Sequence, residues 1–352
     1  MSRDIHKVIL ALSDESRPIS YQLLRNLSEL NTEELRQLQT AWLSLSGQRS
    51  HELLRALVSL AEEHVEYNYY AIFDWLMGDD DPRNRVLAIE GLWEDMNPRH
   101  LERLREIVMQ DEDVEVRAAA AMALGRFVHW GEMGEIAARY GEDAVAVLWD
   151  VYHDPREHVH VRRRALEGIA ASSHAGAARL IENAHYDEDL FMRVSALYAM
   201  GRTADVRWIP YLLPELSSQS PELRMEAARA LGELEAIVAI DPLIRMLDTE
   251  KDSEVRFAIL EALGQIGGDK AKRALQLAAD SEDEAEAEIA EMALEQLYAG
   301  INNLYELIDE VVLGAEPMDE DVYEGDASWE AFYEDPLDAE IRRLLDDEGD
   351  RF

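Results

Sequence analysis

Apolar residues recur along most of this chain with the period of an α-helix, and one such pattern is repeated. Its clearest copies are residues 220–232 (SPELRMEAARALG) and 252–264 (DSEVRFAILEALG). Each copy begins with a residue that can cap a helix and has an arginine four positions later. Small or apolar residues follow three and seven positions after the arginine, on one face. The pattern predicts a helix with a narrow buried stripe that a neighbouring helix can approach closely.

The arginine of this pattern, here called the marker arginine, recurs at nearly constant spacing. It stands at Arg85, Arg117, Arg162, Arg193, Arg224 and Arg256, with separations of 32, 45, 31, 31 and 32 residues. The residue four positions earlier is a good cap at Asp81, Asp113, Asp189, Ser220 and Asp252, and only His158 departs. A second amphipathic segment precedes each copy, at 69–77, 101–109, 144–152, 177–184, 208–216 and 241–247, and 270–278 precedes the last unit. Two helices with short turns fill such a unit, so the spacing predicts stacked helical hairpins and no strands.

The ends of the chain differ from this regular part. Residues 1–65 are helical in pattern without the marker and are expected to form an N-terminal cap, with Ser50 suited to start a helix over 51–64. The array is expected over 66–300, with an insertion near 128–141 that adds a helical turn or a short helix. In the last unit, 284–297, Glu288 replaces the marker arginine. A further helix is expected over 301–314, and the acidic tail 315–352 is expected to be disordered.

These residues carry a family resemblance. The pattern D-x-x-V-R-x-x-A-x-x-A-L-G, found at 113–125 and at 252–264 with Ile259 for the middle alanine, resembles HEAT repeats. The resemblance covers about residues 66–297 and is strongest to the short bacterial units also found in phycobilin lyases. It implies an all-α fold, a right-handed α-solenoid of helical hairpins. It also implies a polar ladder that would join Asp81, Asp113, Asp189 and Asp252 to arginines of adjacent repeats.

Charge and composition exclude several classes of partner. The formal net charge is −40 and the isoelectric point is near 4.5, whereas nucleic acids and anionic membranes bind clustered Lys and Arg. The chain has no cysteine, which excludes disulfides and thiolate chemistry. No stretch approaches the length of a membrane span, and the apolar run at 8–12 is too short for a signal peptide. We expect a cytoplasmic protein with no nucleic-acid or membrane partner.

The strongest candidate for function is a surface. Residues one and five positions after the marker arginine should point away from the paired helix, and in HEAT-like arrays this face is concave. It would carry an apolar strip with two cationic points: Val194, Tyr198, Met225 and Phe257, with Arg163 and Arg229. Exposed apolar strips usually bind another protein or peptide, although neighbouring repeats or the tail could bury these positions instead.

The tail combines 15 acidic and three basic residues with the aromatic residues Trp329, Phe332 and Tyr333. One hypothesis is that residues 329–345 dock into the concave groove, or onto another protein, through these aromatic side chains. The alternative is a tail that only increases solubility.

The sequence gives little support for catalysis. His153, His158 and His160 could share a metal, but no carboxylate stands at a spacing that specifies a site, and solvated loop histidines are the favoured interpretation. Deoxyhypusine hydroxylase, a HEAT-like enzyme class, builds a di-iron site from repeated His-Glu pairs, whereas this chain has one adjacent pair, His51–Glu52, in the cap. Neither a G-x-S-x-G motif nor a Gly-rich phosphate loop is present.

We therefore expect a protein-binding scaffold or adaptor without catalytic residues, cofactor or metal. The alternative is a bilin-lyase-like or chaperone-type enzyme that acts on a partner protein, for which no residue identifies a chromophore site.

Overall fold

The computed structural model describes the backbone of residues 5–314 and the side chains of residue 5 and residues 7–299. This part of the chain is helical throughout and contains no strand, as the periodicity predicts. It divides into two compact units, one ending at Thr203 and the other beginning at Ala204. None of its helices is long and apolar enough to span a bilayer. The tail, with Trp329, Phe332 and Tyr333, lies outside the described residues.

Unit 1 begins with a group of short helices and continues as hairpins. The first group is α1 (Ile5–Leu12), α2 (Tyr21–Leu24), the 3₁₀ helix η1 (Arg25–Leu27), α3 (Thr32–Trp42) and α4 (Gly47–Glu63). The hairpins are α5 (Tyr70–Leu76) with α6 (Pro82–Glu90), α7 (Pro98–Gln110) with α8 (Val114–Glu132), α9 (Ala138–His153) with α10 (Val159–Ile169), and α11 (Ala177–His185) with α12 (Leu190–Arg202). The predicted pairs of helices are therefore confirmed for this unit.

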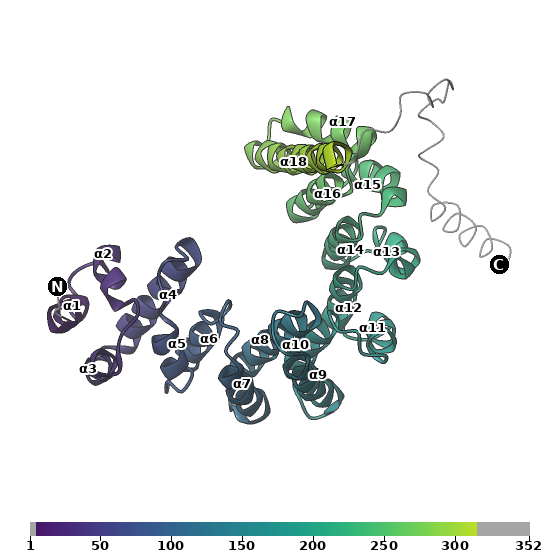
Figure 1. The fold of residues 1–352 in the computed structure, drawn as a ribbon. Coiled ribbons are helices and arrows are strands. Elements are labelled where there is room, and N and C mark those ends of the chain that lie inside the picture. Colours follow the sequence, from purple (N-terminus) through teal and green to yellow (C-terminus); the bar gives the residue numbers. More distant parts are fainter. Residues whose placement is uncertain (1–4, 315–352) are drawn as a thin grey trace, which may run out of the picture. The chain divides into compact units, whose positions relative to one another are not determined.

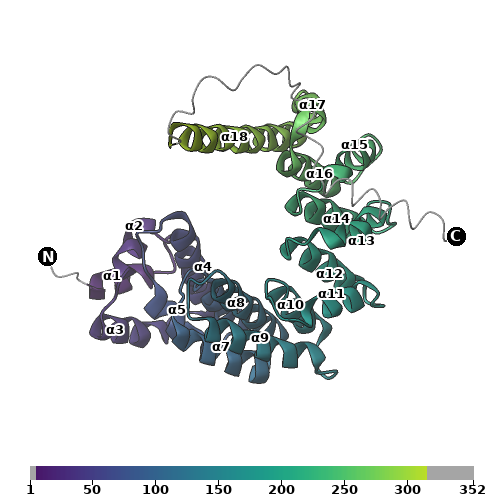
Figure 2. The ribbon, with the colours of Figure 1, turned by 45° about the vertical axis from the view of Figure 1, so that its right-hand side comes forward.

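The second helices of these hairpins carry the marker arginines and pack against one another in order, with α4 of the first group before them. α4 contacts α6, α6 contacts α8, α8 contacts α10, and α10 contacts α12. This order can be followed in Figure 1, and Figure 2 shows α8, α10 and α12 following one another. The small and apolar residues after each marker arginine are buried, including Ala120 with Leu124 and Ala196 with Met200. This stripe lets adjacent helices approach closely, so the predicted packing is confirmed.

Unit 2 repeats the same arrangement. Its helices are η2 (Val206–Trp208), α13 (Ile209–Glu215), α14 (Pro221–Glu233), η3 (Ile237–Ala239), α15 (Ile240–Leu247), α16 (Ser253–Ile266), α17 (Gly268–Ala279) and α18 (Glu284–Gly314). Within it α14 contacts α16 and α16 contacts α18. The helix predicted over 301–314 is the C-terminal part of α18 rather than a separate element. Gly300 lowers helix propensity there, but no proline follows to end the helix before residue 314.

Side-chain caps start the second helices as the sequence predicts. Asp113 Oδ1 accepts hydrogen bonds from the backbone N–H groups of Glu115 and Val116, at 2.9 and 3.2 Å. His158, the exception in the pattern, also caps its helix, because its Nδ1 accepts from the backbone N–H of His160 at 3.2 Å. The helix start is thus preserved where His replaces the usual Asp or Ser.

Two details of the N-terminal group and the insertion differ from or refine the prediction. α4 begins at Gly47 and is capped by Ser46, whose Oγ accepts from the backbone N–H of Arg49, so Ser50 is inside the helix rather than at its start. The insertion lengthens α8 and α9 instead of forming a separate helix. A Cβ built on Gly131 would lie 2.8 Å from the Cα of Gly141, so glycine lets these two longer helices meet.

A polar ladder joins successive repeats, but its acidic members are not the predicted capping residues. Arg85 pairs with Asp111 and Arg117 with Glu157 in unit 1, and Arg224 pairs with Glu250 and Arg256 with Glu286 in unit 2. Each pair is bidentate through Nε and one terminal nitrogen. The capping oxygens of residues such as Asp113 and Asp252 are occupied by backbone N–H groups instead. The expected pairing was therefore wrong in its residues.

Candidate functional site

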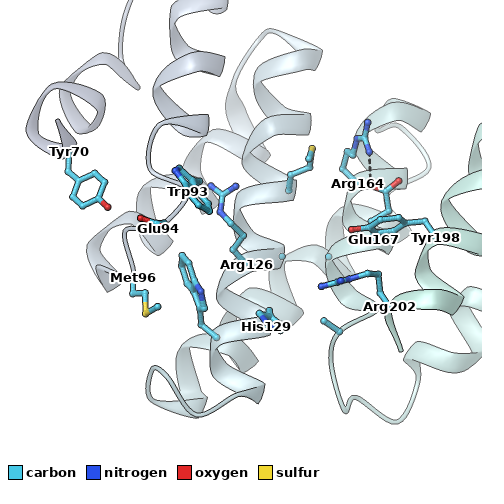
Figure 3. A pocket seen from close by; sticks show the side chains of 15 residues that line it. Tyr70, Trp93, Glu94, Met96, Arg126, His129, Arg164, Glu167, Tyr198 and Arg202 are labelled. Atoms are coloured by element: carbon cyan, nitrogen blue, oxygen red, sulfur yellow. Dashed lines mark hydrogen bonds and ion pairs between the residues drawn. The ribbon is translucent and has the colours of Figure 1, made fainter. Parts of the chain in front are cut away.

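Unit 1 contains a cavity of about 700 Å³ on the layer of second helices. It is lined by residues of α5, α8, α10 and α12 and of the connection between α6 and α7. The main lining side chains are Tyr70, Trp93, Glu94, Met96, Met122, Arg126, His129, Trp130, Arg164, Glu167, Tyr198 and Arg202 (Figure 3). Four consecutive hairpins thus contribute to one site.

The repeat pattern explains which residues face this cavity. Met122 and Tyr198 stand five positions after their marker arginines, and Arg126 and Arg202 stand nine positions after them. Positions five and nine are one helical turn apart, so they lie on the same face of α8 and α12. On the floor, a Cβ built on Gly125 would lie 2.7 Å from the Cα of Gly168, so α8 and α10 touch there through their backbones.

Arg126 is the cation most deeply set in the cavity. Its terminal nitrogen reaches the carbonyl oxygen of Ile89 at 3.4 Å, while its buried Nε has no hydrogen-bond partner in the described part of the chain. Glu90 attracts the guanidinium through space without forming an ion pair. Burial lowers the pKa of Arg126 to about 10, so the group stays protonated at neutral pH. It is a partly dehydrated charge without a bound carboxylate, which is costly unless a ligand supplies one.

The neighbouring charges on α10 are held by a network. Arg164 Nη1 donates to Glu167 Oε2 at 2.7 Å, the ion pair drawn in Figure 3. Glu167 Oε1 accepts at 2.6 Å from Ser195 Oγ, which in turn accepts from Arg163 Nε at 2.9 Å. Glu167 is therefore engaged by its own unit. Arg202, at the exposed end of α12, makes no ion pair within residues 7–299.

Large apolar side chains are exposed around these charges. Trp93 is 40% exposed, Met96 38%, Met122 48% and Tyr198 37%. Trp130 is buried behind them and packs edge-on against Phe127, with ring centroids 5.2 Å apart. The site combines accessible apolar surface with cationic groups, as binding sites for peptides often do.

The structure brings only part of the predicted strip to this cavity. Tyr198 lines it, whereas Val194 is half-buried and outside its lining. Arg163 bonds Ser195 and lies over the ring of Phe191, 5.1 Å from its centroid. In unit 2, Met225, Arg229 and Phe257 are half-buried, and Arg229 Nε lies 3.8 Å from Glu261.

Sequence reasoning missed Arg126, Arg202 and Trp93. Extending the marker series from the fifth to the ninth position would have identified the two arginines. Trp93 follows α6 in a connection that the repeat pattern does not cover, so no periodic signal indicates it.

The candidate metal ligands do not come together. His51 Nδ1 lies 3.2 Å from Asn84 Oδ1, and His153 Nδ1 lies 2.8 Å from the carbonyl oxygen of Trp149. His160 Nε2 lies 3.3 Å from one carboxylate oxygen of Glu115. Among the described residues there is no group of three or more His, Asp or Glu that could hold a metal ion. The residues present around the His51–Glu52 pair therefore do not fit a di-iron centre.

Comparison with known proteins identifies the repeats. A family model of HEAT repeats matches residues 71–159 and 209–295. Human deoxyhypusine hydroxylase is 29% identical over 140 residues, which make up 37% of this chain and 45% of that enzyme. The chain therefore matches less than half the length of this curated relative.

Several solved structures are similar at lower identity. Human deoxyhypusine hydroxylase in complex with glycerol is 19% identical, with 84% of this chain and 96% of that chain covered and a TM-score of 0.33. The E. coli protein YibA is 19% identical, with coverage of 80% and 98% and a TM-score of 0.43. At these values neither similarity carries an argument about function. The two segments that the family model matches make up half of the sequence, and the chain belongs to the HEAT-repeat family.

Proposed function

We propose that this protein is a scaffold or adaptor that binds another protein, and that the cavity of unit 1 is its binding site. The observation that carries the proposal is the combination of exposed Trp93, Met122 and Tyr198 with Arg126, a half-buried cation that makes no ion pair within the described residues. Exposed apolar surface often marks a binding site, and a partly dehydrated cation is stabilised when a ligand supplies a carboxylate, so both features support a ligand here.

The repeat architecture supports a protein ligand rather than a small one. The lining residues come from four consecutive hairpins, and stacked repeats create extended surfaces on which a polypeptide segment can lie. Exposed methionines adapt their shape to different apolar side chains. Met225, Arg229 and Phe257 remain candidate contacts in unit 2 because they occupy corresponding positions. We propose that the protein acts in the cytoplasm, the location expected from its sequence.

Photo-crosslinking tests the proposal. The full chain would be made in its native host with a benzoylphenylalanine at position 198, and separately at position 43, where Leu43 is 86% exposed and outside the cavity. We expect position 198 to yield a defined crosslinked protein that position 43 does not yield. Equal products at both positions, or none at position 198, would contradict the proposal.

An enzyme is the second candidate, because the chain is 29% identical to deoxyhypusine hydroxylase over 140 residues. On the basis of that similarity, the alternative proposal is a hydroxylase-like activity on a partner protein. The bilin-lyase-like alternative rests only on the resemblance of the repeats. Metal analysis and a visible absorption spectrum of the protein purified from its host distinguish the hydroxylase, the lyase and the scaffold. A stoichiometric transition metal would favour the hydroxylase, visible absorbance would favour the lyase, and absence of both would favour the scaffold.

A further inference from the structure

We infer that the cavity of unit 1 binds acidic peptide segments in which carboxylates flank an aromatic side chain. This inference rests on the proposed function and names the chemistry of its ligand. It depends on the local charge, on the missing partner of Arg126 and on the apolar rim, each of which points to the same kind of segment.

The local charge of the cavity is opposite to that of the chain. The chain has a formal net charge of −40, yet Arg126, Arg164 and Arg202 line the cavity beside His129. Of its two lining carboxylates, Glu94 and Glu167, the second is paired with Arg164, which leaves Arg126 and Arg202 against Glu94. An acidic segment would be repelled by most of the protein and attracted here, so electrostatics favour this location.

Arg126 supplies the specific contact. Its Nε is closed off from solvent, its bond to the Ile89 carbonyl is long at 3.4 Å, and its guanidinium makes no ion pair with a carboxylate of the described chain. An Asp or Glu side chain in the cavity could accept charged hydrogen bonds from the terminal nitrogens of this guanidinium. Arg202, exposed at the edge of the cavity, can take a second carboxylate.

The apolar side chains at the rim of the cavity favour an aromatic residue next to the carboxylates of the ligand. Trp93 and Tyr198 expose aromatic surface, and Met96 and Met122 expose thioethers, which make favourable contacts with aromatic rings. A small anion such as phosphate would reach the arginines but leave this surface exposed. A peptide with an aromatic residue next to acidic ones covers both.

Fluorescence anisotropy of a labelled peptide tests the inference with the full chain. The probe has the sequence of residues 327–337, ASWEAFYEDPL, and the control peptide has Gln, Gln and Asn in place of its three acidic residues. We expect the probe to bind and the control peptide to bind at least about tenfold more weakly, as expected from loss of charged hydrogen bonds. Arg126→Met should weaken binding of the probe by about tenfold or more, and Arg202→Gln should weaken it by about two- to fivefold. Arg139→Gln, exposed on α9 outside the cavity, should leave affinity unchanged.

A second form of the full chain separates the sources of the segment. It carries Ser in place of Trp329, Phe332 and Tyr333, so its own tail no longer presents aromatic side chains. If the probe binds to this form but not to the chain with its own tail unchanged, the inference is supported and the tail is identified as a competing occupant of the cavity. Failure of both forms to bind, or equal binding by Arg126→Met or by the control peptide, would overturn it. A partner crosslinked at position 198 that lacks such a segment would leave the proposed function intact and reject only this ligand chemistry.

Discussion

Gly125 of α8 and Gly168 of α10 pack backbone against backbone beneath the cavity. A Cβ built on Gly125 would lie 2.7 Å from the Cα of Gly168, and one built on Gly168 would lie 3.0 Å from the Cα of Gly125. The first distance is shorter than real Cβ contacts and the second is unusually tight, so these two glycines set the spacing of the helices that carry Arg126 and Glu167. The geometry of the cavity thus depends on Gly125, the last residue of the pattern at 113–125, and on Gly168.

Gly125→Ala should destabilise unit 1 by about 1–2 kcal/mol, because the cost of overpacking exceeds the gain in helix propensity. Chemical denaturation followed by circular dichroism measures the change. Gly47→Ala is the matched control, since a Cβ there meets no atom within 4 Å, and it should be neutral or slightly stabilising. Equal effects of the two substitutions would contradict this account of the packing.

Arg126→Met should leave the free protein equally stable or stabilise it by about 1 kcal/mol, because a methionine removes a half-buried charge without a bound carboxylate. The same denaturation experiment measures it. A structural arginine would behave differently: Arg224→Met, which leaves Glu250 without its bidentate partner, should destabilise by about 2 kcal/mol or more. Comparable destabilisation by Arg126→Met would show that Arg126 stabilises the fold and is not held in the cavity to bind a ligand.

The pair formed by Arg224 and Glu250 predicts a pH dependence. Hydrogen bonds from Arg224, and then from the backbone N–H groups of Asp252 and Lys251, lower the pKa of Glu250 from 4.5 to about 2. The carboxylate therefore stabilises the folded state fully above about pH 4.5, and this contribution is lost as the pH falls toward 2.

Glu250→Gln should accordingly lower the free energy of unfolding by about 2 kcal/mol at pH 7, and the difference from the wild type should shrink between pH 4.5 and 2. Glu288→Gln, on the exposed face of α18, is the control and should change stability by less than about 0.5 kcal/mol. A difference for Glu250→Gln that stays constant down to pH 2 would be inconsistent with the lowered pKa.

Ser195→Ala should destabilise unit 1 by about 1–3 kcal/mol, because this buried hydroxyl donates to Glu167 and accepts from Arg163. It should also weaken ligand binding, since Glu167 would be freed to compete for the arginines of the cavity. Thermal unfolding and the peptide titration measure the two effects. Ser44→Ala, whose hydroxyl is exposed and bonds only the carbonyl of Ala41, should change neither.

The repeat pattern was sufficient to predict the helices because burial and capping are local properties. Residues such as Asp113, Ala120 and Leu124 reveal their roles by spacing alone, and the structure places each as expected. The division at Thr203 was not predictable, because the 31-residue spacing of the marker arginines continues through it without a change.

The candidate site was less predictable because it depends on contacts between repeats. Tyr198 was identified from its position in the pattern, but the pattern does not show that Arg126 lacks a partner, since that depends on what surrounds it in space. The ladder failed for a similar reason. Asp111 and Asp113 are both acidic and two residues apart, and only the structure shows which one faces Arg85 and which one caps α8.

Hydrogen exchange of the full chain with and without the acidic aromatic peptide locates the binding site. We expect slower amide exchange in residues 122–130, 164–171 and 198–202, which contain the lining residues of these helices, and no such change in Arg126→Met. Binding of the peptide with unchanged exchange in these segments, or with protection only in unit 2, would contradict the location of the binding site in this cavity.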